Sequence, residues 1–219
     1  MATKTSAATG VQRCLTQIRQ MIVSGSLLPG QKVHQGEIAE LLNVSRIPVR
    51  EALSTLQAEG VLTYKANTGF TVSRFSGEDL AEIYLMRRLL ETEILRSIDL
   101  SRVDVEELEE LNEKLAALSS AENPDEYQDT NHEFHFRLFA YSNLTLVTQE
   151  VQRLWYMSSF YRSLYIQAAD SRLRVHEEHI LIMDAIRDSD IERLIAISNE
   201  HRRSTEALVT QRIGFSRPR

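Results

Sequence analysis

The chain has 219 residues, 42% of them hydrophobic and 26% charged, and its 25 Lys and Arg against 31 Asp and Glu give a net charge of −6. A single cysteine, Cys14, excludes an internal disulfide and any metal site built from several cysteines. No apolar run approaches the roughly 18 residues that span a bilayer, and the N-terminus lacks the apolar stretch of a signal peptide, so we expect a cytoplasmic protein that makes no contact with membranes.

Residues 11–75 predict a winged helix-turn-helix, in which three helices precede a β-hairpin. The expected helices cover 11–24, 36–42 and 45–59, and the expected strands cover 61–64 and 69–72. Residues 1–10 are expected to be a flexible N-terminus. Asn43 is the expected left-handed end of the second helix, and Ser45 is the expected N-cap of the third.

From Ser76 onward the pattern is helical, and residues 76–213 predict an antiparallel helical bundle. This part contains one glycine and one proline and shows no alternation typical of strands. The expected helices cover 76–98, 104–119, 124–140, 144–168, 172–187 and 191–213, and a tail follows at 214–219. The fold class is therefore mainly α, with two domains that meet near Phe75.

The two predicted domains differ in charge. Residues 1–75 hold eight basic and four acidic side chains, a balance of +4, whereas the remaining 144 residues hold 17 basic and 27 acidic ones, a balance of −10. A basic head favours contact with a polyanion such as DNA. Chance clustering on solvated surfaces is the alternative that charge alone leaves open.

The start of the predicted third helix carries the strongest local signal. Arg46 and Arg50 are four residues apart, so they share one helix face, from which they are able to reach guanine edges or phosphates. Ser45 is able to donate to a phosphate, and Pro48 fits the first helical turn. The alternative is a pair of ordinary exposed arginines, but here the helix follows a short helix and precedes a wing.

The segment from Ile22 to Glu91 resembles the GntR family of bacterial transcription factors. The matching pieces are "IVSGSLLPGQKV", "EIAELLNVSRIPVREALSTLQAEGVL" and "NTGFTVSRFSGEDLAEIYLMRRLLE". The resemblance implies DNA contacts from the recognition helix through Ser45, Arg46, Pro48 and Arg50, and from the wing tip at Thr68 and Gly69. The acyl-CoA-responsive member of the family has an arginine where this chain has Gly36, which argues against an identical operator.

Histidines form a second group in the predicted bundle. Asn131 and His135 lie one turn apart on one helix face, and His179 and His201 lie in the middle of two later helices. Three imidazoles and one amide oxygen suit Zn²⁺, Ni²⁺ or another divalent transition ion if they converge. From the residues alone, scattered histidines with ordinary structural roles are the alternative.

The body resembles the all-helical FCD ligand-binding domain of the FadR branch of GntR regulators. The pieces that carry this resemblance are "NHEFHFRLFAYSNLTLV", "HEEHILIMDAIRDSDIERL" and "SNEHRRS". Many members bind a metal through an acidic or amide residue, a histidine four positions later and two further histidines, which implies Asn131, His135, His179 and His201 as ligands. The first ligand is often aspartate, so Asn131 departs from the pattern in charge. His132 and His176 fall one helical step from the matched positions and are interpreted as bystanders.

Three arginines are candidates for binding an anionic effector. Family likeness makes Arg87 a candidate for an effector carboxylate, with an ion pair to Glu91 as the alternative. Arg153 and Arg162 lie on an unusually aromatic predicted helix that is able to line a cavity, although aromatic stripes also form cores and dimer contacts.

These observations predict a homodimeric, effector-responsive transcription factor of the nucleoid that reads double-stranded operator DNA and senses a small carboxylate metabolite through a metal bound by histidines. One alternative is a metal-free regulator that binds an acyl or apolar ligand. A metal-dependent hydrolase is the other, although the chain lacks the H-E-x-x-H spacing: His176 and His179 are three residues apart.

Overall fold

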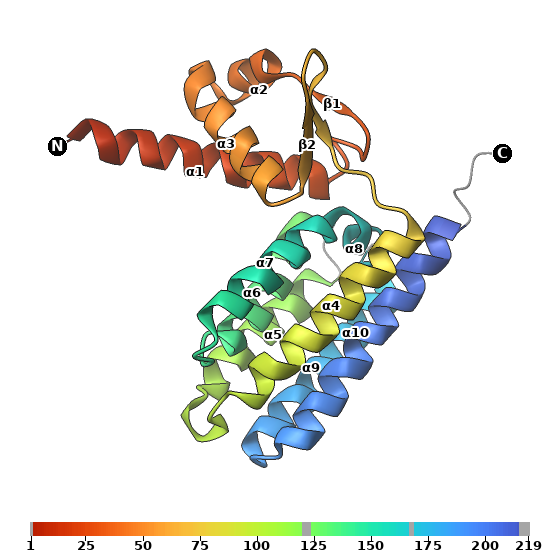
Figure 1. Cartoon of the computed structure of the whole chain (residues 1–219). Helices are drawn as coiled ribbons and strands as arrows, with labels where there is room; N and C mark the ends of the chain where they lie inside the picture. The colour runs from red at the N-terminus through yellow and green to blue at the C-terminus, as the bar shows by residue number, and fades with distance from the viewer. Residues whose placement is uncertain (1, 120–123, 167–168, 215–219) are drawn as a thin grey trace. The chain divides into compact units, whose positions relative to one another are not determined.

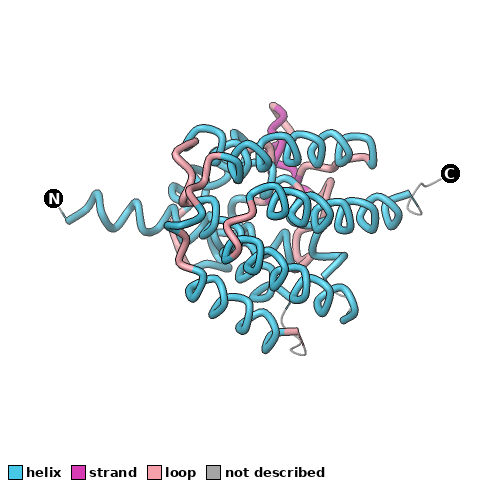
Figure 2. Tube along the Cα trace, turned by 90° about the horizontal axis from the view of Figure 1, so that it is seen from below, coloured by secondary structure: helices cyan, strands magenta, loops and turns pink. Residues whose placement is uncertain are grey.

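The structure, a computed structural model, describes residues 2–119, 124–166 and 169–214. It divides into two compact units, Met1–Phe75 and Ser76–Arg219, which we call the head and the body and describe separately. Helix dominates the trace, and the strands belong to the head (Figure 1, Figure 2). Within the described ranges, no helix combines the length and the apolar character needed to cross a membrane.

The head is a winged helix-turn-helix, as predicted. Its elements are α1 (Ala2–Val23), β1 (Lys32–Val33), α2 (Gln35–Leu42), α3 (Arg46–Ala58), β2 (Leu62–Lys65) and β3 (Gly69–Val72). The antiparallel sheet has the order β1-β3-β2, with Val33 opposite Phe70 and Tyr64 opposite the same residue on the other side. The prediction missed β1 because a strand of two residues is too short to show alternation.

The first helix is longer than predicted. Helix α1 begins at Ala2, so it includes residues 2–10, which the sequence assigned to a flexible N-terminus. No proline interrupts the segment, and a helix without proline continues until a breaker or a cap ends it. Helix α1 packs on α3, and Cys14, Ile18 and Leu53 are fully buried in the head core.

Helix caps explain how the recognition helix is presented. Asn43 adopts φ 51° and ψ 52°, which confirms the predicted left-handed end of α2. Ser45 occupies the N-cap position of α3, but its side chain makes no capping hydrogen bond, contrary to our prediction. An N-cap oxygen accepts from the second or third backbone N–H of the helix. The third helical residue here is Pro48, which has no N–H.

The body is an antiparallel bundle, as predicted. Its elements are α4 (Gly77–Arg96), the short 3₁₀ helix η1 (Leu100–Arg102), α5 (Val105–Leu118), α6 (Pro124–Phe139), α7 (Thr145–Met157), α8 (Ser159–Ile166), α9 (Ala169–Arg187) and α10 (Ile191–Gly214). Helix α9 begins three residues earlier than the predicted 172. Of the predicted tail, residues 215–219 lie outside the described residues.

The single helix predicted over 144–168 is wrong, because α7 and α8 are separated at Ser158. The Ser158 hydroxyl donates to the carbonyl of Leu154, and the Ser159 hydroxyl donates to the carbonyl of Tyr156. Serine hydroxyls that bond back to helical carbonyls compete with the backbone ladder and bend helices. A pair of adjacent serines therefore interrupts an otherwise helical pattern.

The body core lies where α10 packs along α4 and α9, with α5 and α6 closing the other side (Figure 1). Phe134, Ile94 and Leu194 are fully buried there. Helix α4 begins with a capping box, in which the Ser76 hydroxyl accepts from the Asp79 amide and the Asp79 carboxylate accepts from the Ser76 amide. This packing brings polar residues of four helices to one place inside the bundle.

Candidate functional sites

Three histidines from three helices meet inside the body. His135 of α6, His179 of α9 and His201 of α10 are buried, and each offers a ring nitrogen within 4.8 Å of those of the other two. The Nε2 atoms of His135 and His179 are 3.3 Å apart. Two imidazole nitrogens on one tetrahedral Zn²⁺ are also separated by about 3.3 Å, since each Zn–N distance is about 2.0–2.1 Å. The spacing of this pair therefore fits a shared divalent ion.

The Nδ1 atoms of His179 and His201 each contact a polar side chain. Asn112 of α5 donates through Nδ2 to the carbonyl of His176, which directs its Oδ1 toward His179 Nδ1, 3.2 Å away. An amide oxygen only accepts, so His179 carries its proton on Nδ1 and presents a lone pair on Nε2. Glu178 lies 2.6 Å from His201 Nδ1 and orients that ring in the same way. Such outer partners are typical of histidines that bind metals.

Burial keeps two of the rings neutral. Burial, reinforced by the neighbouring His201 and by nearby arginines such as Arg87, holds the pKa of His135 well below its ordinary range. Burial and the neighbouring His135 do the same to the pKa of His179. An imidazole must be neutral to donate a lone pair to a metal. Both rings are therefore in the protonation state that coordination requires.

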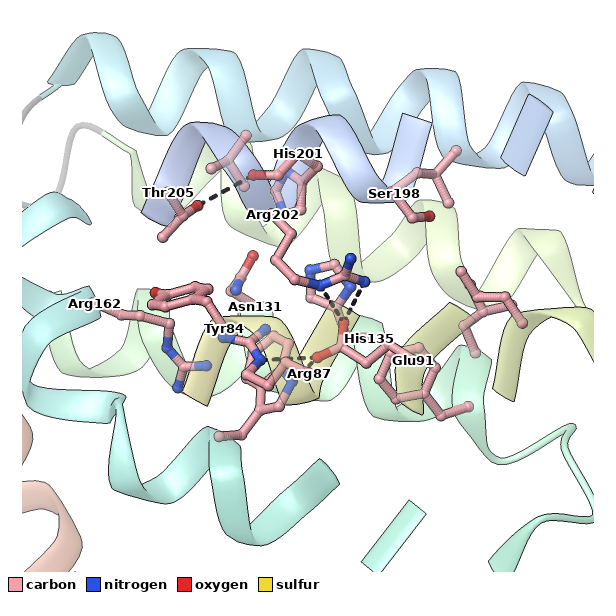
Figure 3. A pocket seen from close by; sticks show the side chains of 16 residues that line it. Tyr84, Arg87, Glu91, Asn131, His135, Arg162, Ser198, His201, Arg202 and Thr205 are labelled. Atoms are coloured by element: carbon pink, nitrogen blue, oxygen red, sulfur yellow. Dashed lines mark hydrogen bonds and ion pairs between the residues drawn. The ribbon is translucent and has the colours of Figure 1, made fainter. Parts of the chain in front are cut away.

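Asn131 lies one helical turn before His135 on α6 and is buried. Figure 3 shows its amide among the side chains of the cavity beside His135. Its Oδ1 has no hydrogen-bond partner among the described residues. A buried acceptor without a partner costs free energy unless a ligand or an ion satisfies it. The oxygen is thus available as a fourth donor, although it brings no charge.

The cavity beside the histidines is small and rich in arginine. Its free volume is about 40 Å³, several times the roughly 10–15 Å³ that one water molecule needs. The charged or polar side chains that line it, which come from α4, α6, α8 and α10, are Tyr84, Arg87, Glu91, Asn131, His135, Arg162, Ser198, His201, Arg202 and Thr205 (Figure 3).

Glu91 is the acidic centre of this lining. Arg87 donates to its Oε1 over 2.8 Å, and Arg202 donates twice to its Oε2, over 3.0 and 2.6 Å. Trp155 Nε1 also donates to Oε1 over 2.8 Å. Burial alone raises the pKa of Glu91, but the charges of Arg202 and Arg87 outweigh it and lower that pKa to about 2. The predicted pair of Arg87 and Glu91 thus exists, and the sequence interpretation missed Arg202.

The other two predicted effector contacts differ in position. Arg162 of α8 lines the cavity, with its guanidinium 4.1 Å from the centre of the Trp155 ring. Arg153 of α7 is not among the lining residues; it is partly exposed and bonded to Glu150. The two arginines lie on different helices, separated by the break at Ser158, and of the two only Arg162 lines the cavity.

His132 packs among aromatic side chains and does not belong to the group of three converging histidines. Its ring stacks on Phe136 with a centroid distance of 4.1 Å and also contacts Trp155 and Tyr156. The prediction that His132 stands apart from the histidine group agrees with this placement. The ring belongs to an aromatic cluster, so its removal should lower the stability of the body.

In the head, the predicted DNA contacts lie on exposed surface at the start of α3 and at the wing. Arg46 and Arg50 are exposed, and within the described residues neither takes part in an ion pair, whereas Arg19 of α1 is paired with Glu59 at 2.6 Å. Ser45 and Thr68 are exposed, and Pro48 is half-buried. Gly69 begins β3 with φ 86°, a left-handed conformation that favours glycine at the tight wing turn.

Comparison with known proteins identifies the class of molecule. Residues 11–72 match the bacterial regulatory proteins of the gntR family, and residues 82–204 match the FCD domain. The chain belongs to the GntR family. It is therefore a DNA-binding transcriptional regulator with an FCD effector domain and not an enzyme, which removes the hydrolase alternative.

Relatives of this GntR protein are regulators of bacterial operons. It is 32% identical to the Nta operon transcriptional regulator of Aminobacter aminovorans over 77% of this chain and 79% of that protein. It is 30% identical to the gluconate operon transcriptional repressor of Bacillus subtilis over 89% of this chain and 82% of that protein. The solved structure of E. coli McbR/YncC has the same fold, with a TM-score of 0.82 and 24% identity over 93% of this chain and 98% of that one.

Proposed function

We propose that this regulator binds a divalent transition metal through His135, His179, His201 and Asn131, and that a small carboxylate binds beside the metal. The observation that carries the proposal is the convergence of three buried imidazoles around nitrogens within 4.8 Å of one another. The unpartnered oxygen of Asn131 supports it. Imidazole donors favour Zn²⁺ or Ni²⁺.

A bound metal supplies a positive charge that attracts a carboxylate oxygen. This chain's residues orient that carboxylate and exclude water: Arg87, Arg162 and Arg202 surround the cavity with guanidinium groups. An acyl or apolar ligand, the metal-free alternative, would bring apolar atoms against three buried cations. The cavity is also lined by six apolar or aromatic side chains, which suit the hydrocarbon part of a small acid: Leu95, Leu138, Phe139, Trp155, Val175 and Ile182. The three cations therefore favour a small acid over an uncharged ligand.

The same proposal assigns Arg46 and Arg50 to base or phosphate contacts, and Ser45, Pro48, Thr68 and Gly69 to the surface around them. The N-terminus of α3 attracts phosphate through its free backbone N–H groups. The Ser45 hydroxyl, which is not used for capping, is free to donate to the same phosphate. We infer a homodimer that places one head on each half of a pseudo-palindromic operator.

Ligand binding controls DNA binding only if the ligand favours one placement of the two heads over another. A ligand with equal affinity for both placements shifts nothing. The gluconate operon relative is named a repressor. We therefore propose that this chain represses transcription as well and that its effector changes operator occupancy.

Metal analysis of the purified protein tests the proposal. His135→Gln should lower both the metal content and the melting temperature, because metal binding stabilises the fold by mass action. His176→Gln is the matched control, since it changes the same residue type one turn before His179 and should leave the metal content unchanged. If the wild type holds no metal and added Zn²⁺ or Ni²⁺ leaves its melting curve unmoved, the metal-free regulator becomes the preferred function.

Asn131→Asp gives a second test, in which the metal affinity should rise and not fall. An added negative charge at a ligand position should tighten metal binding by at least tenfold, or about 1.4 kcal/mol. The affinity is measured by competition against a chelator indicator. Unchanged metal affinity together with a lower melting temperature indicates that Asn131 has only a structural role.

A further inference from the structure

The cavity holds more positive than negative charge. Arg87, Arg162 and Arg202 line it, and Glu91 is its only lining carboxylate among the described residues. Arg87 and Arg202 share that carboxylate. These three guanidinium groups and one carboxylate sum to two positive charges inside the bundle. Glu206 lies close enough to influence the pKa of Tyr84, but it does not line the cavity.

The surplus charge is concentrated at Arg162. Its Nε and Nη1 atoms are buried and have no hydrogen-bond partner among the described residues. The Nη1 atom of Arg87 is also buried and has no such partner there. Both guanidinium groups lie on the Trp155 ring, 4.1 and 4.2 Å from its centre. Burial and the charge of Arg87 lower the pKa of Arg162 to about 9, so the group remains a cation at neutral pH.

The Tyr84 hydroxyl is a further buried donor beside the unpaired guanidinium nitrogens. It is buried, lines the same cavity and has no partner among the described atoms. Burial raises the pKa of Tyr84, so the hydroxyl keeps its proton and is able to donate. Figure 3 shows Tyr84 and Arg162 together on the side of the cavity away from Glu91. Unmatched donors from two arginines and one tyrosine match the acceptors of a single anionic group.

We propose that Arg162, Arg87 and Tyr84 form a second anionic subsite, so that the effector is a short dianion. This inference rests on the proposed function for the first anionic group, which faces the histidines and Asn131. The second group, a carboxylate or a phosphate, accepts from the Arg162 and Arg87 guanidinium groups and from the Tyr84 hydroxyl. The lining alone carries two surplus positive charges, and a bound divalent ion adds two more, so the site favours a ligand with two negative charges over a ligand with one. The small free volume of about 40 Å³ favours a compact chain between the two groups.

The direction in which a substitution of Arg162 changes the melting temperature distinguishes a ligand-binding role of this arginine from a structural role. An arginine that only supports the fold destabilises the protein when it is removed. A buried cation without a partner does the reverse, because its desolvation is not compensated. Arg162→Gln should therefore leave the melting temperature of the ligand-free protein equal or higher while it abolishes the stabilisation by a dianion. Gln keeps polar character and most of the length of the stem.

The experiment measures ligand binding to the full chain by calorimetry and by melting shifts. Malonate, succinate and glutarate are compared with butyrate, which has the carbon count of succinate and one carboxylate, and with inorganic phosphate. At least one of the dicarboxylates should bind at least tenfold more tightly than butyrate, and Arg162→Gln should remove that advantage. Arg153→Gln is the matched control, since Arg153 is bonded to Glu150 outside the cavity, and it should bind like the wild type.

Repeating the titrations after chelation separates this inference from the proposed function. Binding of a dicarboxylate or phosphate that depends on Arg162 in protein without metal supports the subsite even if the metal proposal fails. Phosphate binding that depends on Arg162, without a dicarboxylate advantage, assigns the second group as a phosphate. The subsite is overturned if the protein binds metal but no dianion or phosphate depends on Arg162, or if Arg162→Gln lowers the melting temperature of the ligand-free protein.

Discussion

Glu91 holds two buried arginines of different helices at one point. Removing its charge leaves Arg87 of α4 and Arg202 of α10 without their carboxylate inside the bundle. Breaking a buried ion pair by removing one partner costs about 3–5 kcal/mol. We expect Glu91→Gln to lower the free energy of unfolding by that amount, measured by urea denaturation. Glu93→Gln on the same helix removes an exposed pair and should cost less than about 1 kcal/mol.

The same carboxylate predicts a dependence on acid. Its pKa of about 2 in the fold lies below the ordinary value of 4.5, so the ionised group stabilises the protein. The stabilisation is complete above pH 4.5 and is lost as the pH falls toward 2. Glu91→Gln should remove this contribution from the acid unfolding curve. An acid curve that is identical in the variant contradicts the assignment.

A substitution of Arg50 tests whether the exposed face of α3 contacts the operator. If Arg50 makes a bidentate contact with a base, Arg50→Ala should weaken operator binding by about 1–3 kcal/mol. The melting temperature should hardly change, because Arg50 is exposed and has no ion-pair partner among the described residues. Gel-shift titration measures the affinity, with Arg96→Ala on the exposed surface of α4 as the control. Wild-type affinity in Arg50→Ala rules out the contact.

At the scale of elements, two serines at helix N-caps should behave differently. Ser76 closes the capping box of α4, so Ser76→Ala should cost about 1 kcal/mol of stability. Ser45 makes no capping bond, and Pro48 removes one of the two N–H groups that a cap is able to use, so Ser45→Ala should cost much less. It should instead weaken operator binding through the loss of a phosphate contact. Melting curves and gel shifts on both variants give the comparison, and equal stability losses would contradict it.

The order and type of most elements were predictable because helical periodicity and turn residues are local signals. Asn43 is an example, since an asparagine after an apolar stripe indicates a left-handed helix end. The break between α7 and α8 was not predictable from periodicity, which continues through Ser158. It depends on hydroxyl groups that turn back to the carbonyls of the same helix.

The candidate site was predictable only in part for a geometric reason. The spacing of Asn131 and His135 places them on one face of α6, but the meeting of three helices depends on tertiary packing that no local pattern encodes. Arg202 was missed because it follows His201 directly and should point about 100° away from it. Helix α10 is enclosed on two sides, so His201 reaches Glu178 of α9 while Arg202 reaches Glu91 of α4.

At the scale of the molecule, we predict that residues 76–219 fold alone and form a dimer. The chain divides between Phe75 and Ser76 into two compact units, and the body has its own core. Circular dichroism and sedimentation at micromolar concentration test this. A truncated body that lacks helical signal or sediments as a monomer contradicts it. The isolated head should bind the operator more weakly than the full chain, since it loses the avidity of two linked contacts.

The neutral histidines predict how the metal-free protein responds to pH. His135 and His179 have lowered pKa values in the fold, so unfolding takes up protons below the ordinary value of 6.5. Their contribution to stability is present above pH 6.5 and is lost as the pH falls, with a slope of at most about 2.7 kcal/mol per pH unit for two protons. Urea denaturation in chelator from pH 5 to 8 measures the slope. His135→Gln should reduce it by about half, whereas an unchanged slope contradicts the assignment.

The placement of two residues that occur once each makes the chain convenient for spectroscopy. Cys14, the sole cysteine, is fully buried in the core of the head, and Trp155, the sole tryptophan, lies against Arg87 and Arg162 in the body. A thiol reagent therefore reports the opening of the head alone, whereas tryptophan emission reports the ligand cavity alone. One sample of the natural sequence, without introduced cysteines or tryptophans, is enough to time events in the effector domain against events in the DNA-binding domain.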